Sequence, residues 1–305
     1  LAIPDSGRGL DHALAVPRSL LSQVFAEAVE AEPAVSWHWG TAVTSAGADG
    51  AARIREADGS ASTIRARLVI GADGTSSQVR NPEGFGATVR HTGQRYLRGL
   101  VEAPNACGVP AGEYWTAQGL FGLVPLADGS TYFYADGGDM APRDLEPHAI
   151  ARRWASALPP VRPLLERITG DTTLLLNEVT EVICARYVDG RRVLIGDAAH
   201  AMAPTLGQGA NSAFVDAAVL THLLASGQSQ LQALAGFDRR RRPAVTVVQR
   251  DAHRFMRVTA PHGRLVSGGR NVAARLALRG PTPRGRLARI QQEDPVDLLE
   301  IANRV

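Results

Sequence analysis

Two stretches of the chain place an aspartate just after a short apolar run that ends in glycine. The first reads LVIGAD (68–73) and the second reads VLIGD (193–197). Such runs predict strands buried on both faces, and ligands of open α/β sheets bind at the carboxyl ends of the strands. A carboxylate at that place can accept hydrogen bonds from ligand hydroxyl groups. Asp73 and Asp197 are therefore candidate binding residues, although Asp73 and Ser77 could instead shape a turn and cap a short helix.

A glycine-rich segment follows the second aspartate and opens a predicted helix over 209–225. The free amides and partial positive charge of a helix start favour an anion, or a heterocycle that becomes anionic, such as a reduced flavin. Small residues there allow close approach of the backbone. The candidates are Gly207, Gln208, Gly209, Ala210 and Asn211. Before them stand His200, a candidate base that we favour as a residue ordering the loop, and Pro204, which is expected to shape the cavity.

Several further elements must position these turns. Apolar spacing predicts a helix over 17–32, strands over 35–46, 51–57 and 64–70, and a buried strand over 192–195. Short β-like runs at 96–101, 114–116, 120–126 and 131–135 predict an antiparallel sheet, to which 172–177 returns. Helices are predicted over 147–157 and 160–168 and from 230 onward. We interpret the basic run Arg239–Arg242 as a solvated helix face.

The two turns resemble the second and third fingerprints of the class A flavoprotein monooxygenases, which include para-hydroxybenzoate and salicylate hydroxylases. Residues 71–80 are similar to the family's Asp-Gly motif, and residues 196–211 to its Gly-Asp motif and flavin-facing loop. Arg18 matches a family arginine that contacts FAD. Residues 122–134 are similar to the substrate-domain sheet of the salicylate and urate hydroxylase branch, and residues 238–243 to the helix after the flavin loop.

The resemblance implies an α/β fold with three regions. A doubly wound, Rossmann-like FAD-binding domain, N-terminally incomplete, is expected from residues 1–88 and 188–227. An inserted antiparallel β-sheet substrate domain is expected at 89–187, and a C-terminal helical region at 228–305. The family opens with a βαβ unit that carries Gly-x-Gly-x-x-Gly, but this chain has no such motif and starts at Leu1. We therefore expect a family member that lacks its first segment and retains FAD weakly or not at all.

The resemblance also assigns cofactor contacts. Asp197 is expected to hold the ribityl chain of FAD, and Asp73 to support the cofactor near the place where the nicotinamide reduces it. Arg18 is expected to reach the ribityl–pyrophosphate region, and the backbone of Val43 to line the adenine pocket. The glycine-rich loop is expected at the pyrimidine edge of the flavin.

The implied activity is hydroxylation of a small aromatic or conjugated molecule by O₂ through a flavin hydroperoxide, with NADH or NADPH as electron donor. No protein nucleophile is required, because the cofactor carries the chemistry. Arg98 and Tyr114 are candidate substrate residues, since an arginine in the sheet could hold a carboxylate or an enolate. Two alternatives stay open: a related flavin oxidoreductase that does not hydroxylate, and a non-catalytic remnant that has lost FAD.

The composition excludes several other classes of protein. The chain has 305 residues, of which 45% are hydrophobic and 21% charged, so it is neither disordered nor collagen-like. No apolar stretch is long enough to predict a membrane span. The net charge of +3 does not indicate nucleic acid. Cys107 and Cys184 form no metal-ligand spacing and are expected to be reduced, in the cytoplasm. The substrate and the oligomeric state stay open.

Overall fold

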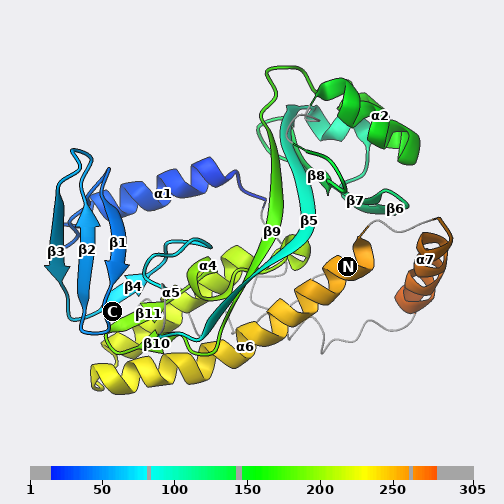
Figure 1. The fold of residues 1–305 in the computed structure, drawn as a ribbon. Coiled ribbons are helices and arrows are strands. Elements are labelled where there is room, and N and C mark those ends of the chain that lie inside the picture. Colours follow the sequence, from blue (N-terminus) through cyan, green and yellow to red (C-terminus); the bar gives the residue numbers. More distant parts are fainter. Residues whose placement is uncertain (1–14, 81–83, 142–145, 261–263, 280–305) are drawn as a thin grey trace. The chain divides into compact units, whose positions relative to one another are not determined.

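The computed structural model describes residues 15–80, 84–141, 146–260 and 264–279 (Figure 1). Within them the chain forms two compact units. The parallel-strand unit comprises residues within 33–91 and 180–255. The antiparallel-sheet unit comprises residues within 1–32, 92–179 and 256–283. The expected division into a cofactor domain and a substrate domain concerns ligands, and it stays a prediction.

In the parallel-strand unit, two strands that are far apart in the sequence lie side by side. β4 (Val69–Gly71) pairs in parallel with β11 (Arg192–Leu194), whose other neighbour is the short antiparallel β10 (Val188–Asp189). β11 is buried throughout, as its apolar run predicts. The strand predicted over 64–70 is wrong in two respects, because its first residues belong to a different sheet and Ile70 is 47% exposed.

A second, antiparallel sheet precedes β4 in the chain. It contains β1 (Ala42–Ala46), β2 (Ala51–Arg55) and β3 (Ala61–Arg65), in that order. The strand predicted from residue 35 begins only at Ala42, because turns and irregular backbone occupy 35–41. A tight turn joins β1 to β2, with the Gly47 amide donating to the carbonyl of Ala51 at 2.8 Å. The turn-rich residues between the two strands therefore act as predicted.

Helices complete the parallel-strand unit (Figure 1). They are α4 (Asp197–His200), the 3₁₀ turn η4 (Pro204–Leu206), α5 (Gly209–Ala225) and α6 (Gln230–Thr259), of which the last extends into the other unit beyond residue 255. α5 has the predicted bounds. The core packs these helices against β4 and β11 through Val79, Val193, Leu194, Val219, Leu220, Leu234 and Phe237.

The antiparallel-sheet unit contains most of the five-stranded sheet predicted from the short apolar runs, and residues 87–91 and 180–184 of this sheet belong to the parallel-strand unit. Its strand order is β6-β7-β8-β5-β9. The strands are β5 (Ala87–Glu102), β6 (Gly112–Thr116), β7 (Gly119–Pro125), β8 (Ser130–Asp136) and β9 (Leu174–Cys184). The predicted return of 172–177 to this sheet is therefore confirmed.

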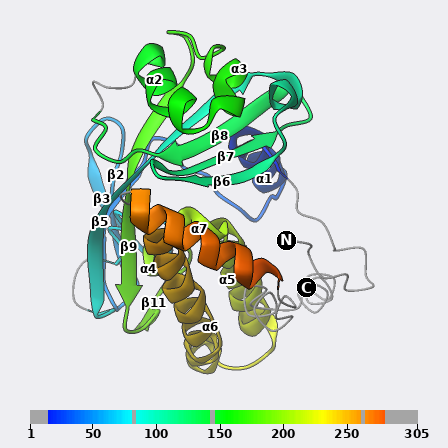
Figure 2. The same ribbon diagram turned by 90° about the vertical axis from the view of Figure 1, so that its right-hand side faces the viewer.

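One face of this sheet is covered by short helices (Figure 2). They are η1 (Pro104–Gly108), α2 (Pro147–Ala157), η3 (Pro159–Val161) and α3 (Arg162–Leu165). α2 has the predicted bounds, whereas the helix predicted over 160–168 is shorter. Phe121 and Phe133 stack at 5.9 Å, and the Trp154 ring meets the edge of Phe121. This aromatic group forms the centre of the unit's core.

Two further helices belong to the same unit. α1 (Arg18–Glu30) confirms the helix predicted near the start of the chain, and none of its residues is buried. α7 (Arg264–Arg279) contacts β6, because Arg270 donates to the Thr116 carbonyl at 3.0 Å and lies 5.7 Å from the Trp115 ring. The helical prediction from residue 230 onward is confirmed over 230–259 and 264–279, and the part beyond 279 lies outside the described residues.

Candidate functional site

The two Gly–Asp turns leave the sheet next to each other. The register pairs Leu194 of β11 with Gly71 of β4, and the amide of Ile195 donates to the Gly71 carbonyl at 3.0 Å. A Cβ atom on Gly71 would stand 2.6 Å from the Leu194 side chain, so the close approach of these strands requires glycine. Asp73 and Asp197 therefore follow neighbouring parallel strands at the same sheet edge, where ligands of such sheets bind.

The first turn is held together by its own aspartate. Asp73 accepts hydrogen bonds from the Ser77 hydroxyl at 2.5 Å and from the amides of Gln78 and Val79 at 2.7 and 3.2 Å. The suggested helix start at Ser77 is wrong, since the described residues after it, 78–80, form bends. Asp73 thus shapes a turn, which is the structural role considered for it as an alternative to ligand binding. Its expected role toward a cofactor stays a prediction.

Arg80 connects the first turn to the second. Its buried guanidinium donates to the carbonyl of Ala198 at 2.7 Å and to the carbonyl of Thr75. Its amide is held by the Ser77 hydroxyl at 2.9 Å. Sequence analysis placed Arg80 in a motif but gave it no role. Its long side chain, close to a short turn, is the only signal that the sequence offers for this bridge.

Asp197 has the geometry expected of a ligand-binding carboxylate. It is exposed at the first position of α4, and no described residue forms a hydrogen bond or ion pair with its side chain. The preceding Gly196 has φ +57° and ψ −144°, a conformation that side-chain-bearing residues rarely adopt. The backbone is therefore forced into a sharp turn that directs the chain into α4 and leaves Asp197 exposed.

The glycine-rich loop presents backbone to open space. Gly207 has φ +64°, so its own conformation requires glycine, and the amides of the first turn of α5 have no side-chain cap. A Cβ atom on Gly207 or Gly209 would meet no atom within 4 Å. Packing within the chain therefore does not explain glycine at 209, whereas a flat ligand held against the backbone would. The neighbouring Ala210 and Asn211 are exposed, Gln208 is half-buried, and Pro204 is exposed at the start of η4.

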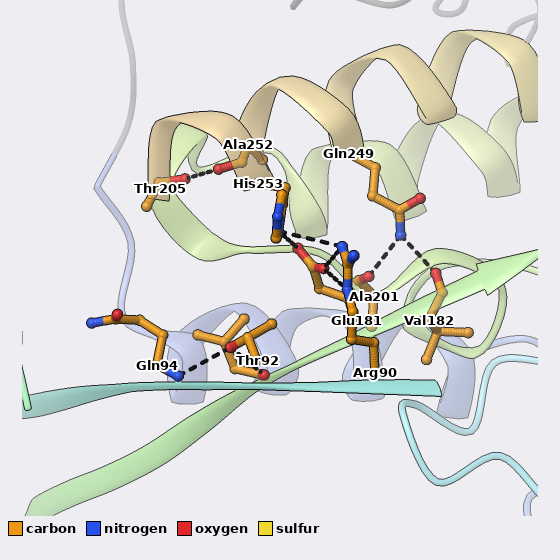
Figure 3. Close-up of polar contacts among 11 residues, drawn as sticks. Arg90, Thr92, Gln94, Glu181, Val182, Ala201, Thr205, Gln249, Ala252 and His253 are labelled. Carbon is orange, nitrogen blue, oxygen red and sulfur yellow. Dashed lines mark hydrogen bonds and ion pairs between the residues drawn. The ribbon is translucent and has the colours of Figure 1, made fainter. Parts of the chain in front are cut away.

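Hydrogen bonds from helix α6 hold the segment that precedes the glycine-rich loop (Figure 3). The Gln249 side chain donates to the carbonyls of Val182 and Ala201 at 2.6 and 2.9 Å. The Thr205 hydroxyl donates to the carbonyl of Ala252 at 2.8 Å. These contacts hold the segment between α4 and α5 in place, while Pro204 and Gly207 of this segment stay exposed.

His200 points away from that exposed side. It is 1% exposed, and its Nε2 donates to Asp216 at 2.5 Å. Asp216 also accepts the Gly196 amide at 3.0 Å and Arg241 Nε at 2.8 Å. This burial and pairing agree with an ordering role for His200 and offer no support for a general base.

The carboxylate at the centre of this network is charged although it is buried. Burial by itself raises the pKa of Asp216, but the hydrogen bond and charge of His200, the charge of Arg241 and the Gly196 amide together lower it below its ordinary value. The carboxylate therefore stays ionised and holds its three donors across the neutral pH range.

Asp216 and Arg241 were not among the predicted site residues. The interpretation of 239–242 as a solvated face is wrong for Arg241, whose side chain is fully buried. A signal existed, because Arg241 lies in the stripe formed by Phe237, Val245, Val248 and Ala252, all of them buried. Its helical spacing, rather than its residue type, places it in the core.

The remaining cofactor candidates lie elsewhere. Val43 is 36% exposed on β1, at an irregularity in its pairing with β2. Arg18 is exposed at the first position of α1, in the antiparallel-sheet unit. The expected contacts of both residues with FAD stay predictions.

The two substrate candidates are not brought together. Arg98 is opposite Tyr134, whose ring crosses Gly122 so that its hydroxyl donates to Glu113 at 2.8 Å. Tyr114 is opposite Phe121 and therefore packs on the core face, and its hydroxyl donates to the Pro110 carbonyl at 2.6 Å. Because strand residues alternate between faces, Arg98 and Tyr114 lie on opposite sides of the sheet.

The described residues contain neither of two other classes of site. No group of three or more His, Cys, Asp or Glu side chains there could hold a metal ion. No helix in the same part of the chain combines the length and the apolar character needed to cross a membrane.

Comparisons with known proteins agree with the geometry. The model of the FAD binding domain family matches residues 7–252. Ubiquinone hydroxylase UbiL of Rhodospirillum rubrum is 36% identical over 173 residues, which are 54% of this chain and 39% of that protein. Kynurenine 3-monooxygenase of Salinispora arenicola is 33% identical over 251 residues, 76% of this chain and 55% of that protein.

A solved structure extends the similarity to the fold. Klebsiella pneumoniae HpxO complexed with FAD and uric acid aligns with a TM-score of 0.69 at 26% identity, covering 83% of this chain and 67% of that one. The chain spans about half the length of the curated relatives that it matches. The α/β fold with its antiparallel sheet is thereby confirmed, and the chain belongs to the FAD binding domain family of the class A flavoprotein monooxygenases.

Proposed function

We propose that this chain is the flavin-binding part of a monooxygenase that uses FAD and NADH or NADPH to hydroxylate a small aromatic or conjugated molecule with O₂ in the cytoplasm. The observation that carries the proposal is Asp197, an exposed carboxylate at the end of β11 without a partner among the described residues. It stands on the same segment as an uncapped helix start and a glycine that packing within the chain does not require. Family membership supports the same reading.

Each residue at this sheet edge has a separate role in binding the flavin. Asp197 would accept hydrogen bonds from the ribityl hydroxyls, and the backbone at Gly207–Asn211 would hold the ring, where the amides and the dipole of α5 would stabilise negative charge. When bound and reduced by the nicotinamide, FAD supplies the transfer of oxygen from O₂ to the substrate. Arg80 keeps the two turns in a fixed spacing by holding the Ala198 carbonyl. Pro204, exposed before the loop, borders the reaction side.

Arg98 is our proposed substrate contact. It lies on the face of the sheet that does not join the core, beside Tyr134 and Tyr132, and its side chain is half-buried. A guanidinium beside two tyrosines suits an aromatic ligand that carries a carboxylate or an enolate. Tyr114 is less suited, because it lies on the opposite face and its hydroxyl is occupied by the Pro110 carbonyl.

The test of the cofactor assignment is an FAD titration followed by fluorescence polarisation. We expect Asp197→Ala to weaken FAD binding at least tenfold. The matched control Asp171→Ala removes an exposed aspartate from a turn of the antiparallel-sheet unit and leaves binding unchanged. Equal FAD affinity of the unaltered chain and the Asp197→Ala variant refutes the assignment. The absence of FAD binding in all three proteins favours the non-catalytic remnant instead.

The test of the reaction is NADH and NADPH consumption with kynurenine and urate, the compounds named in two relatives. A hydroxylated product in proportion to the nucleotide consumed supports the monooxygenase. Consumption without an oxygenated product favours an oxidoreductase that does not hydroxylate. Arg98→Gln is expected to raise the KM of an accepted anionic substrate at least tenfold, with a smaller rise for Arg98→Lys.

A further inference from the structure

A fully buried ion pair stands directly behind the turn that carries Asp197. Asp216 of α5 and Arg241 of α6 have no exposed surface, and Arg241 Nε donates to Asp216 Oδ1 at 2.8 Å. The other carboxylate oxygen, Oδ2, accepts the Gly196 amide at 3.0 Å and His200 Nε2 at 2.5 Å. One oxygen of Asp216 therefore faces the ion-pair partner, and the other holds both ends of the segment 196–200.

We propose that Asp216 is a positioning residue for the flavin: it fixes the Gly196–Asp197 turn so that the Asp197 carboxylate meets the ribityl chain. This inference rests on the proposed function, and it adds a residue that has no contact with the ligand. Gly196 is the residue that needs such support, because its backbone conformation is unfavourable for a free chain. Its amide is buried, and an unpaired buried amide is costly.

The Arg241 guanidinium decides how the side-chain amide of an asparagine at position 216 would be oriented. In Asp216→Asn the side chain has one oxygen and one NH₂ group, so it can no longer accept from both sides. If the oxygen faced Gly196, the NH₂ group would face a buried guanidinium, which is the costlier conflict. We therefore expect the amide oxygen to turn toward Arg241. The NH₂ group then faces the Gly196 amide, which is left without a hydrogen-bond acceptor.

The same argument predicts a rescue. In the double variant Asp216→Asn/Arg241→Met the guanidinium is absent, so the amide oxygen is free to return to the Gly196 amide. FAD affinity should then recover toward that of the unaltered chain. A residue that contributed only to general stability would show no recovery when a second buried contact is removed.

The chain provides a matched control in Glu181 (Figure 3). Glu181 is also fully buried, and it also accepts hydrogen bonds from one arginine and one histidine. Arg90 Nε and His253 Nδ1 lie 2.9 and 3.0 Å from its oxygens. No hydrogen bond joins this cluster to the segment 196–200, so Glu181→Gln disturbs a buried carboxylate of the same kind without releasing the turn.

Two measurements test the proposal on the full chain. The first is amide hydrogen exchange of peptides covering 193–203 without FAD, and the second is FAD affinity by fluorescence polarisation. Asp216→Asn should speed exchange in these peptides and weaken FAD binding at least tenfold. Glu181→Gln should change neither quantity by more than about threefold, and the double variant should restore both.

Three results would overturn the inference. One is unchanged exchange over 193–203 in Asp216→Asn, and another is an equal loss of FAD affinity in Glu181→Gln. The third is a double variant that folds but still binds FAD at least tenfold more weakly than the unaltered chain. This result decides the question even if Asp216→Asn fails to fold. The proposed function fails separately, when Asp197→Ala binds FAD as tightly as the unaltered chain, whatever Asp216→Asn does to exchange.

Discussion

Asp136 at the end of β8 makes the stability of the antiparallel-sheet unit depend on pH. Its side chain has no exposed surface, and it accepts hydrogen bonds from the Gly138 amide at 2.8 Å and from the Gln94 side chain at 2.6 Å. Burial raises its pKa to about 6, although these donors and the charge of Arg153 act in the opposite direction. The replacement Asp136→Asn keeps the shape and removes the charge, and the Gln94 amide can turn to present its oxygen.

The size of the effect follows from the shift. A pKa of about 6 in the folded chain and an ordinary value of 3.8 differ by about two units, which correspond to about 3 kcal/mol. Between these values the folded state binds more protons than the unfolded state, so the free energy of unfolding falls as pH rises. The stability from the neutral carboxyl is complete below pH 3.8 and is lost as pH rises through about 6. Asp136→Asn should match the unaltered chain near pH 4 and exceed it by about 3 kcal/mol at pH 8.

Urea unfolding followed by tryptophan fluorescence at pH 4, 5, 6, 7 and 8 measures this difference. The matched control is Asp171→Asn, which removes an exposed carboxylate from a turn of the same unit. Its difference from the unaltered chain should stay flat over the same range. A flat difference for Asp136→Asn, or one that grows toward low pH, would refute the argument that burial dominates at this carboxyl.

Two substitutions test the turns, and one labelling experiment tests the burial of the two thiols. Gly196→Ala should lower the free energy of unfolding by about 1–3 kcal/mol in urea, because its φ is +57° and the added Cβ would stand 3.0 Å from Ala213; a neutral result would contradict the turn geometry. Arg80→Met should cost about 3 kcal/mol in the same assay, since a buried charged donor to two backbone carbonyls is lost, and a loss below 1 kcal/mol would argue against the bridge. Burial raises the pKa of the Cys184 thiol to about 11, so at pH 8 the native chain should react with a disulfide reagent at Cys107 well before Cys184, and equal rates would count against this burial.

Patterns carried by local chemistry predicted much of the fold. The helix over 147–157 begins at a proline in its first position, and the helix over 209–225 follows a glycine in the left-handed region, and both have the predicted bounds. The two apolar runs that each end in glycine predicted β11 and part of β4 as strands. These features depend on backbone conformation and on apolar periodicity, which act over a few residues.

Charged residues in the core were not predicted, because their burial depends on partners that are distant in the chain. Arg192 begins a strand that was predicted from its apolar residues, yet its side chain is buried and donates to the Ala46 carbonyl at 2.7 Å. Asp216 and Arg241 are 25 positions apart and meet only when α5 packs on α6. Residue type alone assigns such groups to the surface, so only the spacing within each helix could have indicated otherwise.

The substrate face shows a second kind of limit. Alternation along one strand tells which residues share a face, but the relation between two strands depends on their register. Arg98 on β5 and Tyr114 on β6 are separated by two intervening strands, so three registers decide whether they face the same side. A shift of one residue at any of these pairings would move one of them to the opposite face.

The ion pair between Asp216 and Arg241 raises the question of why a core keeps charges at all. A well-packed apolar pair of the same volume is often at least as stable as a buried ion pair, so stability alone does not account for it. An apolar side chain at 216, however, could accept neither the Gly196 amide nor the His200 proton. The carboxylate is needed to hold the turn, and His200 and the Arg241 guanidinium together lower its pKa and keep it charged. The network is therefore best understood as a support for the backbone that presents Asp197, and its charges follow from that requirement.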